Sequence, residues 1–310
     1  MPALHITNGA AIAESLRGAG ADAVVSWDDI LYEGPVPARQ DDATLRWTRA
    51  KFLARAGWAD QQIAWQELMD RDAAMEKVDA STTVVLWFDT CLSDQLQSLQ
   101  VLDRLARRGR IRDPIRVVDP TALTFGLQPS RVRPLHRAAS PLEHGTLDRA
   151  ASAWAAFRSP SPFALTPFST GPTAGLPHLR PAIQRLVQEY PWTTDGLSRS
   201  DRDILGAAAN EETLADAFKR ISDLEDTAFM GDLVFEWRVR RLMSGDTPLV
   251  EVDRGGWGGT LSLTPAGAAI VGGLRSALEI VRIDRWIGGA RLLGAPPALY
   301  DPTADSLVAP

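Results

Sequence analysis

The chain has 310 residues, of which 45% are hydrophobic and 23% charged, so it is long enough for a sizeable core in one large domain or two. Its net charge of -6 argues against broad, nonspecific coating of nucleic acid, although it leaves room for a local basic face. A single cysteine, Cys91, excludes an intrachain disulfide and suits a reducing cytoplasm. We expect neither a signal peptide nor a membrane span, because no apolar segment approaches the roughly 20 residues needed.

Strand and helix patterns alternate over residues 1–125. Apolar runs of strand length lie at 3–7, 23–27, 81–88 and 114–120. Helical patterns separate them, at about 10–18, over 44–75 as two helices split near Gly57, and from residue 92 with leucines on one face. Strands joined by helices imply right-handed crossovers and a parallel sheet. We therefore predict a Rossmann-like α/β domain here.

Composition changes after this domain. Residues 126–180 are rich in Pro, Ser and Gly, with one amphipathic helix at about 147–157, and read as a connecting region. Residues 181–275 contain helical patterns, a strand–turn–strand pattern at 248–264 and a closing helix that starts at Pro265. This layout predicts a mainly helical, winged-helix-like domain, followed by a C-terminal extension over 276–310.

Polar side chains gather where the predicted strands end. Carboxyl ends of parallel strands meet at one edge of a sheet, where ligands commonly bind. The candidate catalytic residues are the carboxylates Asp28, Asp89 and Asp94. The candidate ligand-binding residues are their polar neighbours, His5, Thr7, Asn8, Gly9, Asp29, Glu33 and Gln95.

These carboxylates have two interpretations. Several at one rim can bind a divalent cation, or one can act as a general acid or base if crowding raises its pKa. Asp is also a favoured helix N-cap and turn residue. The turn at Asn8-Gly9 has one glycine and lacks the lysine of a phosphate loop, which favours a plain turn over a nucleotide site and leaves room for a small anion. The sequence assigns no metal and no cofactor.

Cys91 opens the helix after the third strand. A helix N-terminus lowers the pKa of a thiol, although a lone cysteine is more often a small buried hydrophobe.

The helix expected at 231–243 carries two candidate nucleic-acid contacts, Arg238 and Arg241. We expect it to bury Leu233, Trp237 and Leu242, so that both arginines point outward. They would contact DNA phosphates, or pair with acidic groups if the domain docks a protein. Docking is favoured because the surrounding sequence is acidic.

Five segments resemble a bacterial family described only as domain of unknown function 1835. They are HITNG (5–9), WDDILYEGPVP (27–37), LWF followed by LSDQLQ (86–97), YPWTTDGLSRSDRDIL (190–205) and IDRWIGGARL (283–292). The resemblance implies an α/β N-terminal half and names no reaction. Relatives usually carry an Asp where this chain has Ala10, and Glu-His-Asp where it has Asp89-Thr90-Cys91. If those polar residues do chemistry, this chain has lost or changed it, and if they only cap helices, little follows.

We expect the chain to bind a small polar or anionic ligand at the carboxyl ends of the sheet, with hydrolase or transferase chemistry left open. The alternative is a ligand-sensing regulator whose winged-helix domain binds DNA or a protein. In either case the loop Asp28–Pro37 is expected to fold over the sheet and meet Asn8 and Gly9.

Overall fold

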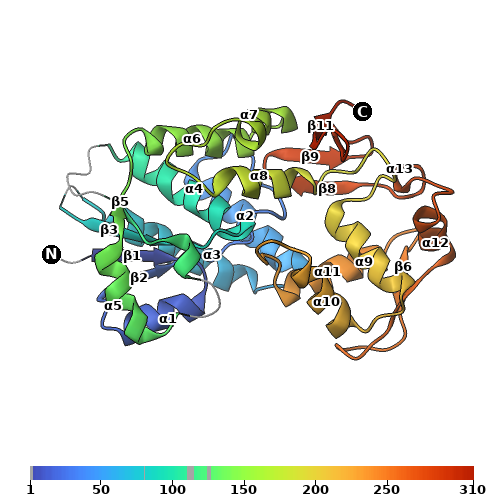
Figure 1. Ribbon diagram of the computed structural model, residues 1–310, viewed down its shortest axis with the longest axis horizontal. Coiled ribbons are helices and arrows are strands. Elements are labelled where there is room, and N and C mark those ends of the chain that lie inside the picture. The colour runs from blue at the N-terminus through green and yellow to red at the C-terminus, as the bar shows by residue number, and fades with distance from the viewer. Residues whose placement is uncertain (1–2, 80, 110–114, 124–126) are drawn as a thin grey trace.

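A five-stranded sheet forms one end of an elongated molecule, as the computed structural model shows for residues 3–79, 81–109, 115–123 and 127–310 (Figure 1). Its strands are β1 (Ala3–Thr7), β2 (Ala23–Ser26), β3 (Thr83–Trp87), β4 (Arg116–Val117) and β5 (Ser140–Pro141). They run in the order β2-β1-β3-β4-β5, with the first four parallel and β5 antiparallel to β4. Ile6 of β1 lies opposite Val25 on one side and Leu86 on the other. The prediction of an α/β fold with a mostly parallel sheet is confirmed.

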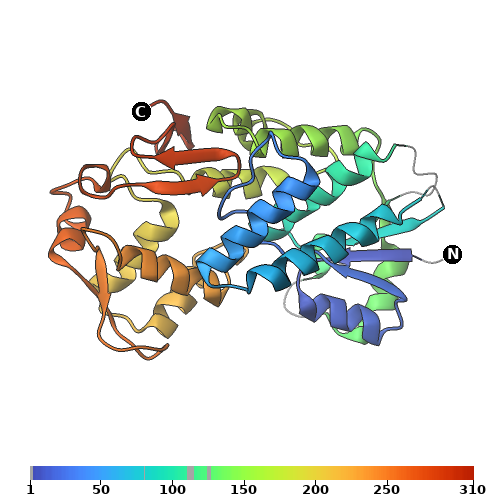
Figure 2. The same cartoon turned by 180° about the vertical axis from the view of Figure 1, so that it is seen from behind.

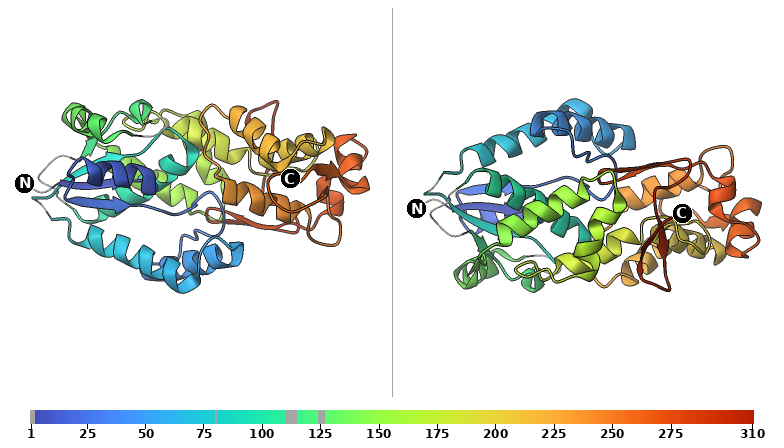
Figure 3. Two further views of the ribbon diagram at one scale, coloured as in Figure 1. Left: turned by 90° about the horizontal axis from the view of Figure 1, so that it is seen from below. Right: turned by 90° about the horizontal axis from the view of Figure 1, so that it is seen from above.

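Helices cover both faces of this sheet (Figures 1 and 3). On one face lie α1 (Ala10–Gly18) and α5 (Pro129–Ala138), packed on β3 through Val85 and Trp87. The opposite face, covered by α3 and α4, receives Leu4, Ile6, Val84 and Leu86. The bounds of the helices on this side are α2 (Asp42–Ala56), α3 (Gln61–Glu76), α4 (Leu92–Arg107) and α6 (Thr146–Phe157), with α6 packed on α4. All of Val84–Trp87 are buried, as a continuous apolar strand predicts.

The region expected to connect two domains contains several helices and a strand of the sheet. Besides α6, residues 126–180 contain α5, η2 (Pro162–Leu165) and α7 (Thr166–Thr170) in their described part, and β5 extends the sheet. The expectation of one helix is therefore wrong. Prolines explain the error, because Pro129 stands in the first turn of α5, where its missing N–H costs nothing. The expected boundary at 125/126 lies outside the described residues.

The following region has the expected succession of elements. They are α8 (Leu179–Val187), α9 (Arg199–Ala209), α10 (Leu214–Asp223), α11 (Asp232–Leu242), the antiparallel pair β6 (Val250–Val252) and β7 (Leu261–Leu263), and α12 (Pro265–Val271). Ser198 caps the N-terminus of α9, since its Oγ accepts a hydrogen bond from the Asp201 N–H over 3.1 Å.

The C-terminal segment folds back toward the sheet. It contains α13 (Ala277–Ile280) and two hairpins, β8 (Asp284–Ile287) with β9 (Ala290–Leu293) and β10 (Leu299–Asp301) with β11 (Ser306–Val308). The β8–β9 hairpin lies beside the loop that follows β2 (Figure 2). The two are joined where the Val36 N–H donates to the Gly288 carbonyl over 2.7 Å.

Among the described residues, no helix combines the length and the apolarity needed to cross a membrane.

Candidate functional site

The loop after β2 and the turn after β1 meet at the carboxyl end of the sheet. Asp28 Oδ1 accepts a hydrogen bond from the Gly9 N–H over 2.9 Å. Asn8 Nδ2 donates to Asp94 Oδ1 over 2.6 Å, and Asp94 Oδ2 accepts from the Asp89 N–H over 2.7 Å. Parallel pairing thus places these polar residues at one rim, as the topology predicted.

Hydrogen bonds to the backbone occupy the polar groups of this rim. Asp89 Oδ1 accepts from the Thr90 N–H, Gln95 Nε2 donates to the Asp89 carbonyl, and the Thr7 hydroxyl donates to the Trp87 carbonyl. No cluster of three or more His, Cys, Asp or Glu side chains suited to a metal ion occurs in the part of the chain that the structure describes. The geometry is that of turns and helix starts, and the catalytic roles of Asp28, Asp89 and Asp94 stay predictions.

Cys91 is the small buried residue that the sequence favoured, and not the activated thiol that its position at a helix N-terminus left open. It is buried, and its Sγ donates to Asp94 Oδ1 over 3.3 Å. Burial and the neighbouring Asp94 carboxyl raise the pKa of the Cys91 thiol. Burial also raises the pKa of Asp94. The thiol is therefore neutral, and desolvation outweighs any effect of the helix terminus.

His5 lies within the sheet and not at its rim. Its Nδ1 accepts a hydrogen bond from Trp87 Nε1 over 3.0 Å, and the His136 ring lies 5.2 Å away, centroid to centroid. Burial, with a smaller effect of His136, lowers the pKa of His5 to about 4.

This lowered pKa predicts a pH-dependent stability. Unfolded His5 regains a pKa near 6.5, so between pH 6.5 and about 4 the unfolded chain binds more protons than the folded one. The free energy of unfolding therefore decreases as the pH is lowered through this range. We expect His5→Gln to lose this part of the slope in urea unfolding at pH 7, 5.5 and 4.5. The exposed His144→Gln is the control. An unchanged slope in His5→Gln would contradict the assignment.

Asp29 and Glu33 point away from the rim, and Asp29 anchors the loop. The Arg49 guanidinium donates to Asp29 Oδ1 from Nη2 over 2.7 Å and from Nε over 3.1 Å. The same side chain donates to the Ile30 and Glu33 carbonyls over 2.9 and 2.8 Å. Because Arg49 is only 1% exposed, this pair fixes the loop from inside.

Glu33 enters a buried charge network with Glu189, Arg238 and Arg285. Arg238 Nη2 donates to Glu33 Oε1 and, over 2.6 Å, to Glu189 Oε2. Arg285 Nη2 donates to the same two oxygens over 3.2 and 3.1 Å. The three arginines nearest Glu189 hold its pKa well below the usual range, although burial opposes them, and the carboxylates raise the pKa of Arg238.

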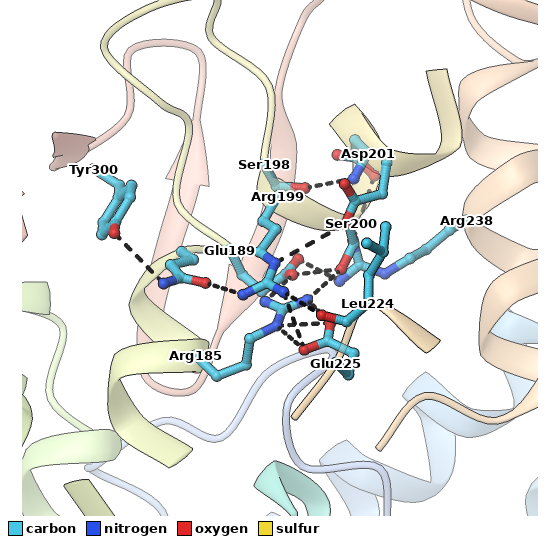
Figure 4. Close-up of polar contacts among 12 residues, drawn as sticks. Arg185, Glu189, Ser198, Arg199, Ser200, Asp201, Leu224, Glu225, Arg238 and Tyr300 are labelled. Atoms are coloured by element: carbon cyan, nitrogen blue, oxygen red, sulfur yellow. Dashed lines mark hydrogen bonds and ion pairs between the residues drawn. The ribbon is translucent and has the colours of Figure 1, made fainter. Parts of the chain in front are cut away.

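A second layer surrounds Glu189 (Figure 4). Arg185 Nη1 donates to Glu189 Oε1 over 2.8 Å, and the Ser200 hydroxyl donates to the same oxygen over 2.5 Å. Arg185 also binds the Glu225 carboxylate from Nη2 over 2.7 Å. Arg238 Nη1 donates to Asp201 Oδ1 over 3.3 Å. The network therefore joins the loop after β2 to α8, α9, α11 and β8.

The burial of Arg238 overturns its expected outward position. Within α11 the buried residues are Val234, Phe235, Arg238 and Val239. Leu233, expected in the core, is 49% exposed, while Trp237 and Leu242 are partly buried. The apolar residues of this face pack in the main core, and Arg238 pairs with the buried carboxylates of Glu33 and Glu189. Arg238 therefore has no surface from which to contact DNA.

A cavity of about 410 Å³ opens beside this network. Its walls come from the loop after β2, from α2, from α11 and from the β8–β9 hairpin. Gly34 shapes the loop wall: its φ of 78° is left-handed, and a Cβ there would lie 2.5 Å from the Phe52 ring. Adjacent residues of the loop thus have two roles: Glu33 enters the charge network, and Gly34 allows the backbone to pack closely against Phe52.

Positive charge dominates the cavity. Two of its cations are paired, Arg285 with Glu33 and Arg291 with Asp284 over 3.2 Å. Three other cations line the cavity, Lys51, Arg55 and Arg241, and none of them forms an ion pair with a described residue. Burial, followed by the charge of neighbouring Arg285, lowers the pKa of the partly buried Arg241. An anion in the cavity would relieve this repulsion.

Of the residues in this network and cavity, the sequence analysis singled out only Glu33, Arg238 and Arg241 as candidate binding residues. Three of the five quoted segments meet here, since Glu33 lies in the second, Ser200 and Asp201 in the fourth and Arg285 in the fifth. Charged residues inside these segments were the available signal.

No family model matches the chain, and neither the curated proteins nor the solved structures include a significant match to it. The resemblance to the family of unknown function stays a prediction.

Proposed function

We propose that the protein binds a small anionic ligand in the cavity between the loop after β2, α2, α11 and the β8–β9 hairpin. The observation that carries the proposal is the presence of three cations without acidic partners, Lys51, Arg55 and Arg241, around one cavity of about 410 Å³. This volume falls within the roughly 300–1,000 Å³ typical of small-molecule sites. The loop that forms one wall begins at the carboxyl end of β2. The proposed site therefore lies on the expected side of the sheet, but outside the rim where the sequence analysis placed it.

Binding is favoured over hydrolase or transferase chemistry. The rim carboxylates are engaged with backbone N–H groups, and Asp29 and Glu33 are paired with buried arginines. We infer a Rossmann-like domain from the parallel sheet with helices on both faces, and a winged-helix-like domain from the order of α9–α11, β6–β7 and α12. The regulator alternative then relies on protein docking, because Arg238 is buried and Arg241 lines the cavity.

The test is calorimetric titration with inorganic pyrophosphate at low salt. We expect Arg241→Gln to weaken binding by about 10- to 100-fold, the range for losing a charge-assisted hydrogen bond. Arg240→Gln is the matched control, since Arg240 is the adjacent arginine on α11, is exposed and does not line the cavity. Absence of binding by the wild type, or equal loss in both variants, would contradict the proposal.

A further inference from the structure

The aromatic side chains of the cavity fall into two groups. Phe52 and Trp237 pack with Trp58 in edge contacts, with ring centroids 5.3 to 6.1 Å apart. Trp286 lines the cavity from β8 and contacts no other aromatic ring among the residues described. Its neighbour is a cation, with the Arg291 guanidinium carbon 5.9 Å from the ring centroid. One partly exposed indole thus lines the cavity without a ring to stack on.

This indole and the unpaired cations lie in different walls of the same space. Lys51 and Arg55 come from α2 and Arg241 from α11, whereas Trp286 comes from the β8–β9 hairpin. A ligand that used all of these groups would need a charged end and a flat end. The charged end would carry more than one negative charge, because it would have to balance three cations that form no ion pair with a described residue. Guanidinium groups match the oxygen geometry of phosphate.

We propose that the ligand is a phosphate ester that bears an aromatic ring, of the nucleoside 5′-monophosphate class. The ring stacks on Trp286, and the dianionic phosphate is bound by Arg241 with Lys51 and Arg55. This inference rests on the proposed anion site and adds the ring. Stacking of one base on an aromatic side chain strengthens binding by about 5- to 150-fold. Adenosine 5′-monophosphate should therefore bind by that factor more tightly than ribose 5-phosphate.

The experiment titrates the full-length protein with both compounds. In the wild type we expect the stated preference for adenosine 5′-monophosphate. Trp286→Leu should abolish the preference while leaving the affinity for ribose 5-phosphate unchanged. Trp47→Leu should keep the preference, because Trp47 is 49% exposed on α2 and does not line the cavity. Trp286→Phe, which keeps a ring, should retain a smaller preference and serves if the leucine variant does not fold.

Other outcomes separate this inference from the proposed function. Equal binding of the two phosphates by the wild type would overturn the stacking role and leave the anion site standing. If neither compound binds, or if Arg241→Gln leaves the affinity for both compounds unchanged, both proposals are overturned. Isophthalate, an aromatic dicarboxylate, is the third arm of the titration. Tighter binding of isophthalate than of adenosine 5′-monophosphate would overturn the assignment of a phosphate.

Discussion

Replacing Arg238 with alanine is expected to lower the free energy of unfolding by about 3–5 kcal/mol, the usual cost of removing one partner from a buried ion pair. Both Glu33 and Glu189 are at most 1% exposed, and Arg238 binds both. Without Arg238, the two carboxylates stay buried and keep only their remaining hydrogen bonds and ion pairs, such as those with Arg285. Urea unfolding followed by circular dichroism measures the loss.

Arg240→Ala is the control for this change. Arg240 is the second arginine along α11, is exposed and forms no ion pair with a described residue, so its loss should stay within about 0.5 kcal/mol. A cost below about 1 kcal/mol for Arg238→Ala would mean that water reaches the carboxylates and that the network is not a dry one.

Leu86→Ala is the other change with a large expected effect, about 2–5 kcal/mol off the free energy of unfolding. Leu86 is 1% exposed on β3, which lies between β1 and β4 in the sheet, and it belongs to the main core cluster. Truncation removes apolar contacts and leaves a cavity, which persists because the closely packed strands and helices around it relax only in part.

The control for Leu86 is Leu293→Ala, because Leu293 is 47% exposed at the end of β9. Its truncation should cost less than about 1 kcal/mol. Comparable losses for the two leucines in thermal and urea unfolding would show that β3 is not the packed centre of the sheet.

Local patterns predicted most of the elements. The apolar run of β3 and the leucine face of α4 are visible as periodicity, and Gly57, with a left-handed φ of 79°, ends α2 where the split was expected. The helix α5 was missed because prolines at 129 and 134 interrupt its pattern. The two-residue strand β5 is too short to show any alternation.

The sequence predicted the position of site residues only where the order and direction of the strands determine that position. Consecutive parallel strands bring Asp28 to Gly9, and no side-chain detail is needed for that expectation. The buried position of Arg238 depends instead on its partners Glu33 and Glu189, which lie 205 and 49 positions away in the chain. An arginine in an amphipathic helix is usually solvated, so a helical pattern places it outside. Only the buried carboxylates reverse that preference, and the sequence does not reveal their burial.

The contact between Glu33 and Arg285 spans 252 positions of the chain. Ribosomes add about 5–20 residues per second, so on the order of 10–50 s separate the synthesis of these two side chains. During that interval the strands β1 to β4 have all been made, yet the loop after β2 still lacks the hairpin that holds Val36 and the arginine that neutralises Glu33. The cavity is therefore a late product of synthesis, and a nascent chain has its sheet segments before it has a binding site.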